Sequence, residues 1–325
     1  MNNSALRNST IMTIHTLYKI AKITEQCLAF ITVVANVLIL TLILSKKQLR
    51  TPFNAALGSM AMACLVFTCS YYFLATIIGF TQATFPIFSL ALYPISNSTI
   101  SILNLHVTLI CILRYFFVAS PFAYQKFITK KSISIILVSI WICMLSFVYG
   151  MRAACGYLIR SYNTTTDHYE NYTVARQIYC FLYIGIVAIL PVFAIFITYF
   201  QLHHIIKRHI NNIDDQRKSR SKSLTSLPDK EYSKDKALKQ MLCLLMMFLI
   251  SWIPFFMIRI FIKHRIPNLT LILLYHGSSL LVHVYIFFCP LHHAYYTPDI
   301  REEFQQWFKD LPGIVAKGIK KLFCF

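Results

Sequence analysis

The residue with the most distinct chemistry is Arg114, in the sequence Leu113-Arg114-Tyr115 at one end of a long apolar stretch. That stretch, residues 87–118, contains no Asp or Glu that could pair with the guanidinium. A cation buried in apolar surroundings of this kind costs about 2.5 kcal/mol or more on membrane-insertion scales, so by default it marks a functional site. The sequence predicts that Arg114 meets a partner from outside its own segment.

The other reactive side chains lack the groupings that catalysis or metal binding requires. The adjacent pairs His203-His204 and His292-His293 would point apart on a helix, so neither pair can hold one metal ion. No segment combines a nucleophile with a base and an orienting acid. Most cysteines lie within apolar stretches as small packing residues, without zinc-like spacing to His. The sequence predicts no enzyme, no metal site and no cofactor.

The elements that position Arg114 follow from composition. The chain of 325 residues is 57% hydrophobic and 13% charged, with a mean hydropathy of +0.59, which indicates an integral membrane protein. Apolar runs long enough to cross a bilayer as helices recur along the chain, and none alternates like a barrel strand. They cover residues 27–44, 55–80, 87–118, 133–149, 178–199, 241–262 and 269–295. The predicted fold is an all-α membrane protein, a bundle of seven transmembrane helices.

The distribution of charge predicts the orientation of the bundle. Most of the 31 Lys and Arg residues follow the first, third, fifth and seventh runs, which makes that side cytoplasmic and the N-terminus extracellular. Glycosylation sequons fall on the opposite side, at Asn2, Asn8, Asn163, Asn171 and Asn268. The net charge of +19 then reflects this bias rather than nucleic-acid binding. We expect an extracellular N-terminus (1–25), a membrane domain (26–296, third cytoplasmic loop about 205–236) and a cytoplasmic helix with tail (297–325).

Short patterns in these runs resemble the motifs of rhodopsin-like (class A) G-protein-coupled receptors. They are Ala35-Asn36-Val37, Arg114-Tyr115 with Pro121 and Tyr124, Trp141, Pro191 with Tyr199, Phe248 with Ser251-Trp252-Ile253-Pro254, and Cys289-Pro290-Leu291-His292-His293. Residues Asp299 to Phe304 resemble the start of the short cytoplasmic helix that follows the seventh span. The resemblance covers essentially the whole chain. It implies a divergent member of this family that passes the binding of an extracellular ligand to a heterotrimeric G protein at the plasma membrane.

The resemblance assigns activation and G-protein coupling to residues on several spans. They are Arg114, Tyr115, Pro191, Tyr199, Phe248, Trp252, Pro254, Pro290 and His293. The residues also support this assignment physically, because each proline removes a backbone donor and can act as a kink. Trp252, just before Pro254, is a bulky side chain through which a ligand could tilt the inner half of its helix.

Several positions depart from the family pattern. Leu113 and Lys234 stand where acids usually restrain the arginine, so we expect raised basal signalling, unless other packing compensates. Cys64 replaces the aspartate of the family's sodium site, so we expect no sodium effect, since sodium prefers oxygen ligands. His293 replaces a tyrosine, which puts its usual contact with Tyr199 in doubt.

The outer halves of the spans indicate the class of ligand only weakly. Ser96 replaces the aspartate of amine receptors, and His283 the lysine that links retinal in opsins, so both of those ligands are disfavoured. A candidate site for a neutral or anionic ligand, such as a lipid acid or a peptide, consists of Ser96, Tyr183, Trp252, Phe255, Phe256, Arg259, His276, Ser279 and His283. Two alternatives remain open: a receptor-like heterodimer partner that does not signal, and a small membrane transporter, although no internal repeat supports the latter.

The loops and tail hold candidate modification sites. Cys155 and Cys180 flank the second extracellular loop and are candidates for a disulfide, since the outside is oxidising. After residue 297 an amphipathic helix with Ile300, Phe304 and Trp307 on one face should lie on membrane lipid, and Cys324 is a candidate for palmitoylation. Ser and Thr residues cluster in the third cytoplasmic loop rather than in the tail, so arrestin is expected to depend on that loop.

Overall fold

The computed structural model describes residues 3–81, 86–161, 177–219, 228–264, 269–307 and 309. The long helices are α1 (Asn3–Ser45), α2 (Pro52–Thr81), α3 (Pro86–Ala119), α5 (Lys130–Ser161), α7 (Leu190–Ser219), α8 (Pro228–His264) and α9 (Leu269–Tyr296). Short elements are the 3₁₀ turn η1 (Lys47–Leu49), α4 (Pro121–Phe127) and the π-helical turn η2 (Gly185–Ile189), which continues a helical stretch at 177–184. A further helical stretch covers 298–307, and the described residues contain no strand.

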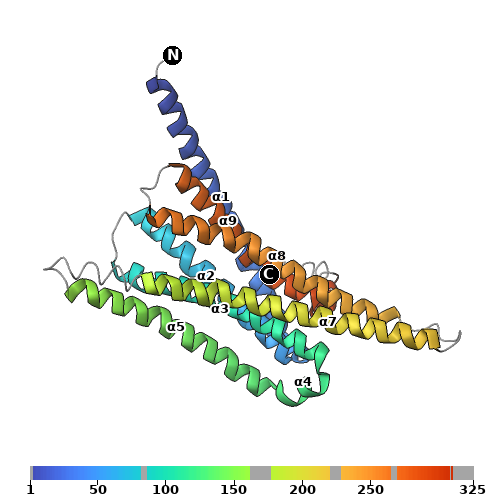
Figure 1. The fold of residues 1–325 in the computed structure, drawn as a ribbon. Helices are drawn as coiled ribbons and strands as arrows, with labels where there is room; N and C mark the ends of the chain where they lie inside the picture. The colour runs from blue at the N-terminus through green and yellow to red at the C-terminus, as the bar shows by residue number, and fades with distance from the viewer. Residues whose placement is uncertain are drawn as a thin grey trace, which may run out of the picture.

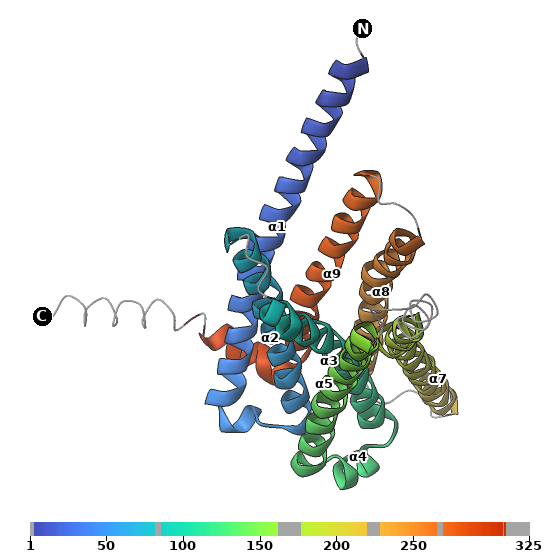
Figure 2. The same ribbon diagram turned by 90° about the vertical axis from the view of Figure 1, so that its left-hand side faces the viewer.

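Seven of these helical segments are long and apolar enough to cross a membrane, which confirms the predicted seven-helix bundle. They are Lys19–Ser45, Pro52–Tyr72, Pro94–Ala119, Lys130–Ala154, Gln177–Arg208, Leu238–Ile258 and Leu273–Tyr296. Helix α1 continues beyond its span as far as Asn3 and projects past the other helices (Figure 2). It therefore crosses residue 25, the expected end of the extracellular segment, without a break.

Helix α3 occupies the middle of the bundle (Figure 1). It packs against α2, α5, α7 and α8, while α1 and α9 pair with each other and with α2 on one side. Side chains on the outside of the bundle are large and apolar: Phe30 is 72% exposed and Phe181 is 75% exposed, as expected for surfaces that face lipid. Arg114 is thus placed at the end of the helix with the most neighbours.

Small polar side chains line the buried faces of α3. Ser98, Ser101 and Thr108 each donate to the backbone carbonyl four residues earlier, at 2.8, 2.9 and 3.0 Å. Small residues allow close approach of membrane helices, and these bonds leave their hydroxyls satisfied without water. These three hydroxyls can therefore be buried where α3 packs closely against its neighbours, without contact with water.

Two proline breaks are bridged by side chains from neighbouring helices. Pro191 has no N–H to donate to the carbonyl of Val187, four residues earlier. The Nδ2 of Asn104, on α3, donates to that carbonyl at 2.9 Å, within the π-helical turn. In the same way Pro290 leaves the Ile286 carbonyl without its helical donor, and the Cys64 thiol of α2 donates to it at 3.6 Å.

The break at Pro254 differs from these two. Pro254 lies within α8, where it leaves the Ile250 carbonyl without its helical donor. Among the described residues, no side chain of another helix donates to that carbonyl. The breaks in α7 and α9 are therefore tied to α3 and α2, whereas the break in α8 has no comparable tie.

A polar link joins three helices on the other side of the bundle. The indole Nε1 of Trp141 on α5 donates to the Ser59 hydroxyl on α2 at 3.0 Å. The same hydroxyl lies 2.8 Å from Nε2 of His106 on α3, whose Nδ1 lies 2.6 Å from the Ile102 carbonyl. Because all these groups are buried or half-buried, the link fixes α2, α3 and α5 relative to one another.

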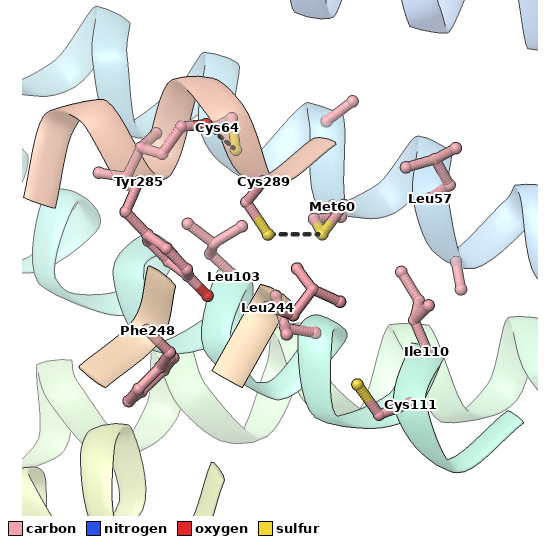
Figure 3. Close-up of a cluster of buried hydrophobic side chains, with 14 of the residues drawn as sticks. Leu57, Met60, Cys64, Leu103, Ile110, Cys111, Leu244, Phe248, Tyr285 and Cys289 are labelled. Carbon is pink, nitrogen blue, oxygen red and sulfur yellow. Dashed lines mark hydrogen bonds between the residues drawn. The ribbon is translucent and has the colours of Figure 1, made fainter. Parts of the chain in front are cut away.

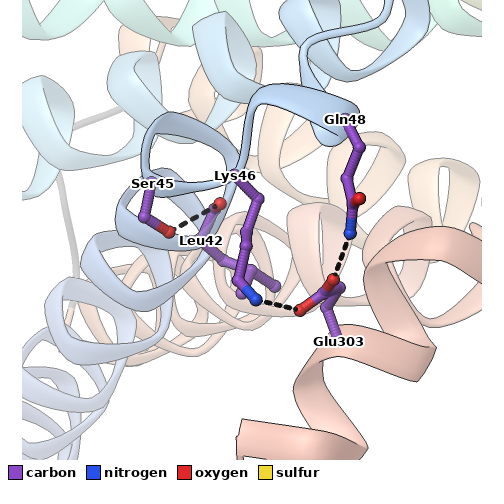
Figure 4. A network of polar contacts seen from close by, with 5 residues as sticks. All are labelled: Leu42, Ser45, Lys46, Gln48 and Glu303. Atoms are coloured by element: carbon purple, nitrogen blue, oxygen red, sulfur yellow. Dashed lines mark hydrogen bonds and ion pairs between the residues drawn. The ribbon is translucent and has the colours of Figure 1, made fainter.

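The helical stretch 298–307 forms the predicted amphipathic helix after the seventh span. Its Ile300 is fully buried, and Phe304 packs against the core. Glu303 joins this helix to the end of α1: one carboxylate oxygen lies 3.0 Å from the Lys46 ammonium and the other accepts a 2.6 Å bond from Gln48 (Figure 4). The bond from Lys46 is the main reason that the pKa of Glu303 lies below its usual value.

Candidate functional site

Arg114 lies near the end of the central helix, half-buried and without an acidic partner among the described residues. Its guanidinium lies 4.9 Å from the centre of the Phe53 ring on α2, a cation–π distance, and its buried Nε has no hydrogen-bond partner. Among the described residues, no carboxylate forms an ion pair with it. Leu113 is 2% exposed and packs in the hydrophobic core, so it offers Arg114 no polar contact. The side chain of Lys234 lies outside the described residues.

Two histidines on α9 lie near Arg114. His293 is fully buried, the ring centres of His292 and His293 are 5.9 Å apart, and none of their four ring nitrogens has a hydrogen-bond partner in the described chain. Both rings are close enough for the charge of Arg114 to act on them. Tyr199 instead stacks on His203 of its own helix at 6.4 Å, and no described contact joins it to His293. This end of the bundle therefore concentrates buried polar nitrogens that have no partner among the described residues.

An aromatic cluster fills the bundle around Trp252, two residues before Pro254. The Trp252 ring lies 5.9 Å from Phe248, 5.3 Å from Phe256 and 6.1 Å from Tyr285 of α9. Trp252 is 2% exposed, so rotation of its side chain would displace all of these neighbours. The structure thus brings Phe248 and Trp252, two predicted activation residues of α8, close to Pro254, whose break no described side chain of another helix bridges.

Sulfur atoms occupy the middle of the bundle around Cys64, the position at which the sequence resemblance implied the loss of a sodium site. Figure 3 shows Cys289 of α9 facing Met60 of α2, with 3.9 Å between the sulfur atoms. Cys64, Cys289 and Met60 are all fully buried, and Leu103 of α3 lies beside them. The labelled residues of this cluster include no carboxylate, so it offers none of the charged oxygen ligands that a hard cation prefers.

The residues predicted to bind the ligand divide into two groups in the structure. Phe255 and Phe256 belong to the Trp252 cluster, and the buried Tyr183 donates from its hydroxyl to the Asn97 carbonyl of α3 at 3.0 Å. Ser96 and His283 face α2 instead. The Ser96 and Ser70 hydroxyl oxygens are 3.0 Å apart, and His283 lies among aromatic rings of α2. Ser279 accepts from His283 Nδ1 through its carbonyl at 2.7 Å, and His276 packs on Tyr275.

Sequence reasoning missed the residues around His283. Phe67, Tyr71 and Tyr72 of α2 surround its ring at 5.7, 5.1 and 5.5 Å between ring centres. Glu25 of α1 is 2% exposed and lies close enough to act on the Tyr72 hydroxyl. The signal was present, because Glu25 is an acid in an apolar run, just as Arg114 is a cation in one.

Several predicted sites lie outside the described residues or side chains. They are the sequons at Asn2, Asn8, Asn163, Asn171 and Asn268, the ligand residue Arg259, Cys155 of the candidate disulfide, and Cys324. Cys180 is described and half-exposed, but its pairing stays a prediction because the side chain of Cys155 is not described.

The arrangement is that of a seven-helix membrane receptor, and comparison with known proteins defines its family. Residues 35–291, from the first span to the seventh, match the 7 transmembrane receptor (rhodopsin family) model. The chain belongs to this family. It is similar to trace amine-associated receptor 1 of Macaca mulatta, with 26% identity over 80% of the chain and 81% of that receptor. It is also similar to muscarinic acetylcholine receptor M2 of Gallus gallus, with 30% identity over 46% of the chain and 34% of that receptor.

Membership sets the general role. The chain is a G-protein-coupled signalling receptor, a multi-pass protein of the plasma membrane whose partners are an extracellular ligand and a G protein. Its relatives are receptors and not enzymes.

Proposed function

We propose that the receptor activates its G protein through Arg114, which the outward movement of the inner half of α8 exposes. Two features of the described chain together support this proposal. The guanidinium of Arg114 is half-buried and has no carboxylate partner there, and the proline break in α8 is bridged by no neighbouring helix. The kink at Pro254 has no such tie and is easier to change than those at Pro191 and Pro290, and a cation without an acid is ready for acceptor groups of another protein.

Binding energy reaches this hinge through the aromatic cluster. A ligand that presses on Phe255 or Phe256 displaces Trp252, which stacks on Phe256 and packs against Tyr285 of α9. A core this tightly packed has a few discrete arrangements rather than a continuous range, so a small displacement favours a second arrangement of α8. The ligand shifts the equilibrium only by the difference in its affinity for the two arrangements.

Guanine-nucleotide exchange on purified G proteins tests the proposal. Purified receptor in nanodiscs should accelerate exchange on at least one G-protein class, and Arg114→Ala should abolish the acceleration. Arg50→Ala is the matched control, because Arg50 is exposed and its guanidinium bonds to the nearby Leu44 carbonyl. Equal exchange by Arg114→Ala and wild type would contradict the assigned role. Well-folded wild-type receptor that accelerates exchange on no class, with or without ligands, would favour the heterodimer partner that does not signal.

Raised basal activity follows from the same residues. An acid at position 113 would give Arg114 an ion pair of about 1 kcal/mol, equivalent to about a fivefold shift between resting and active states. Because Leu113 is buried, Leu113→Asp also loses packing, so Leu113→Asn is the matched control. We expect lower ligand-free output from the Asp variant than from the Asn variant at equal surface expression. Equal ligand-free output from the two variants would refute the hypothesis that the lack of an acid beside Arg114 raises basal activity.

The ligand proposed for the candidate binding residues is neutral or anionic. Ser96, where amine receptors of the family carry an aspartate, bonds to Ser70, and Tyr183 is a neutral donor nearby. The relatives' names refer to a trace amine and to acetylcholine, so an amine is the competing class at this site. Lipid acids, peptides and amines should be compared as agonists in the exchange assay, with activation by amines alone counting against the proposal.

The remaining assignments concern the membrane faces. Charge distribution and the sequons support an extracellular N-terminus and a cytoplasmic C-terminus, with the tail on membrane lipid. The third loop contains Ser219, Ser221, Ser223, Thr225 and Ser226 among basic residues. If arrestin requires phosphate on this loop, changing these five residues to Ala should abolish its recruitment while exchange continues. Normal arrestin recruitment by that variant would contradict the proposed role of the third loop.

A further inference from the structure

The charge of Arg114 meets an aromatic ring of α2. Its guanidinium lies 4.9 Å from the centre of the Phe53 ring, inside the roughly 6 Å over which a ring face attracts a cation. Within the described chain the guanidinium donates no hydrogen bond and joins no ion pair, and its Nε is buried. The face of the Phe53 ring therefore compensates part of a charge that no described acceptor group compensates.

The first turn of α2 holds this ring in place. Thr51 caps the helix, because its hydroxyl accepts a bond from the Asn54 N–H at 3.2 Å, and Pro52 follows at the first helical position, where its fixed φ suits the helix. The Asn54 side chain donates back to the carbonyl of the buried Leu49 at 2.8 Å, and the half-buried Phe53 packs against the core. None of these bonds uses the side chain of Phe53. The ring is thus positioned by its neighbours, and replacing it should leave the start of the helix intact.

The contact ties Arg114 to the side of α3 that faces α2. Helices α2 and α8 pack against α3 from different sides (Figure 2). In the proposed function, α8 moves outward and an acceptor group of the G protein reaches Arg114 through the space that opens. The guanidinium has to leave the Phe53 ring to point into that space. The contact therefore stabilises only the arrangement in which α8 is closed, and its loss favours the open one.

We propose that Phe53 restrains Arg114 in the resting receptor through this cation–π contact, so that a ring rather than an acid holds the arginine. The inference rests on the proposed outward movement of α8. Because both side chains are half-buried, the contact should shift the equilibrium between the closed and open arrangements by about two- to fivefold. Phe53 thus limits basal signalling without abolishing it, and this restraint is additional to the one that an acid at position 113 would supply.

The distance between α4 and α8 measures the restraint without any G protein. Spin labels at Lys126→Cys and Lys239→Cys, both exposed positions, report the displacement of α8 in full-length, ligand-free receptor in nanodiscs whose other accessible cysteines are replaced. Phe53→Leu removes the ring and should raise the open-to-closed ratio by about two- to fivefold. Phe287→Leu is the matched control and should not change the ratio. Phe287 is also half-buried, but its ring packs on Phe288, and no described Lys or Arg lies over it.

Two further arms separate the cation–π contact from packing. In the Arg114→Ala background the ring has no guanidinium to hold, so Phe53→Leu should no longer change the open-to-closed ratio, whereas a packing role of the ring would persist there. Trifluorinated phenylalanine in place of Phe53 keeps the shape of the ring but weakens the attraction of its face for a cation. It should therefore raise the ratio as Phe53→Leu does, and the same replacement of Phe287 should leave the ratio unchanged.

The outcomes distinguish this restraint from the proposed function. An unchanged ratio in Phe53→Leu, or an equal rise in the Arg114→Ala background, would overturn the restraint even if Arg114→Ala abolishes guanine-nucleotide exchange. The expected response to Phe53 would support the restraint even if Arg114→Ala and wild type give equal exchange, a result that contradicts only the role of Arg114 toward the G protein. If Phe53→Leu does not fold, the trifluorinated ring decides, and an unchanged ratio with it would reject the proposal.

Discussion

The bond from Asn104 to the Val187 carbonyl predicts a measurable coupling with Pro191. Asn104→Ala removes a donor at 2.9 Å from a carbonyl within the π-helical turn. A buried carbonyl that loses its hydrogen bond costs about 1–3 kcal/mol in soluble proteins, while bonds between membrane helices average about 0.6 kcal/mol. We therefore expect about 1 kcal/mol from the lost bond, in addition to the loss of packing.

A double-mutant cycle separates the bond from the packing. Pro191→Ala restores an N–H four residues after Val187, so the carbonyl regains a donor within its own helix. Asn104→Ala should then cost about 1 kcal/mol less in the Pro191→Ala background than in wild type, because the packing loss is the same in both and cancels. The assay is the free energy of unfolding from reversible detergent titration of all four proteins. Equal costs of Asn104→Ala in the two backgrounds would refute the idea that Asn104 compensates for the proline.

Two further predictions follow from the sulfur cluster and from Glu303. Replacing sodium by a matched cation such as N-methylglucammonium should change neither the unfolding temperature nor ligand affinity, because Cys64 and Cys289 offer no carboxylate; a millimolar sodium dependence would show that oxygen ligands exist elsewhere. The pKa of Glu303 lies below its usual value of 4.5, so its contribution to stability is present at neutral pH and is lost as the pH falls from 4.5 through the lower folded-state pKa. The difference in unfolding temperature between wild type and Glu303→Gln should therefore vanish in acid; a constant difference down to pH 3 would mean that the ion pair with Lys46 does not cause it.

Hydrophobicity predicted most of the fold, because a membrane segment must satisfy its own backbone and is therefore helical wherever it is apolar for long enough. The seven spans, the helix after Pro298 and the clustering of Trp252 with Phe248 and Phe256 were predictable in this way. The inner end of α3 was also predictable, since a lone Arg114 is unusual at such a place in any sequence.

Contacts between helices were not predictable from local patterns. Nothing in the sequence around Cys64 indicates that its thiol meets the carbonyl freed by Pro290, because that pairing depends on how α2 and α9 turn toward each other. The burial of Glu25 was not predictable for the same reason, because it depends on the direction in which its side chain points and not on its position along α1. The side chain of Arg259 is not described, so its place in the ligand site stays a prediction.

The link from Trp141 to Ser59 to His106 determines where one proton resides. An indole N–H can only donate, so the Ser59 oxygen accepts from Trp141 and has its single hydrogen left for Nε2 of His106. A carbonyl can only accept, so Nδ1 of His106 carries the hydrogen that faces Ile102. Nε2 of His106 is therefore an acceptor, and the Ser59 hydroxyl has to donate to it. A backbone carbonyl on α3 thus sets the direction of a hydrogen bond from α2, and the oxygen lone pairs of Ser59 remain to receive the Trp141 indole of α5.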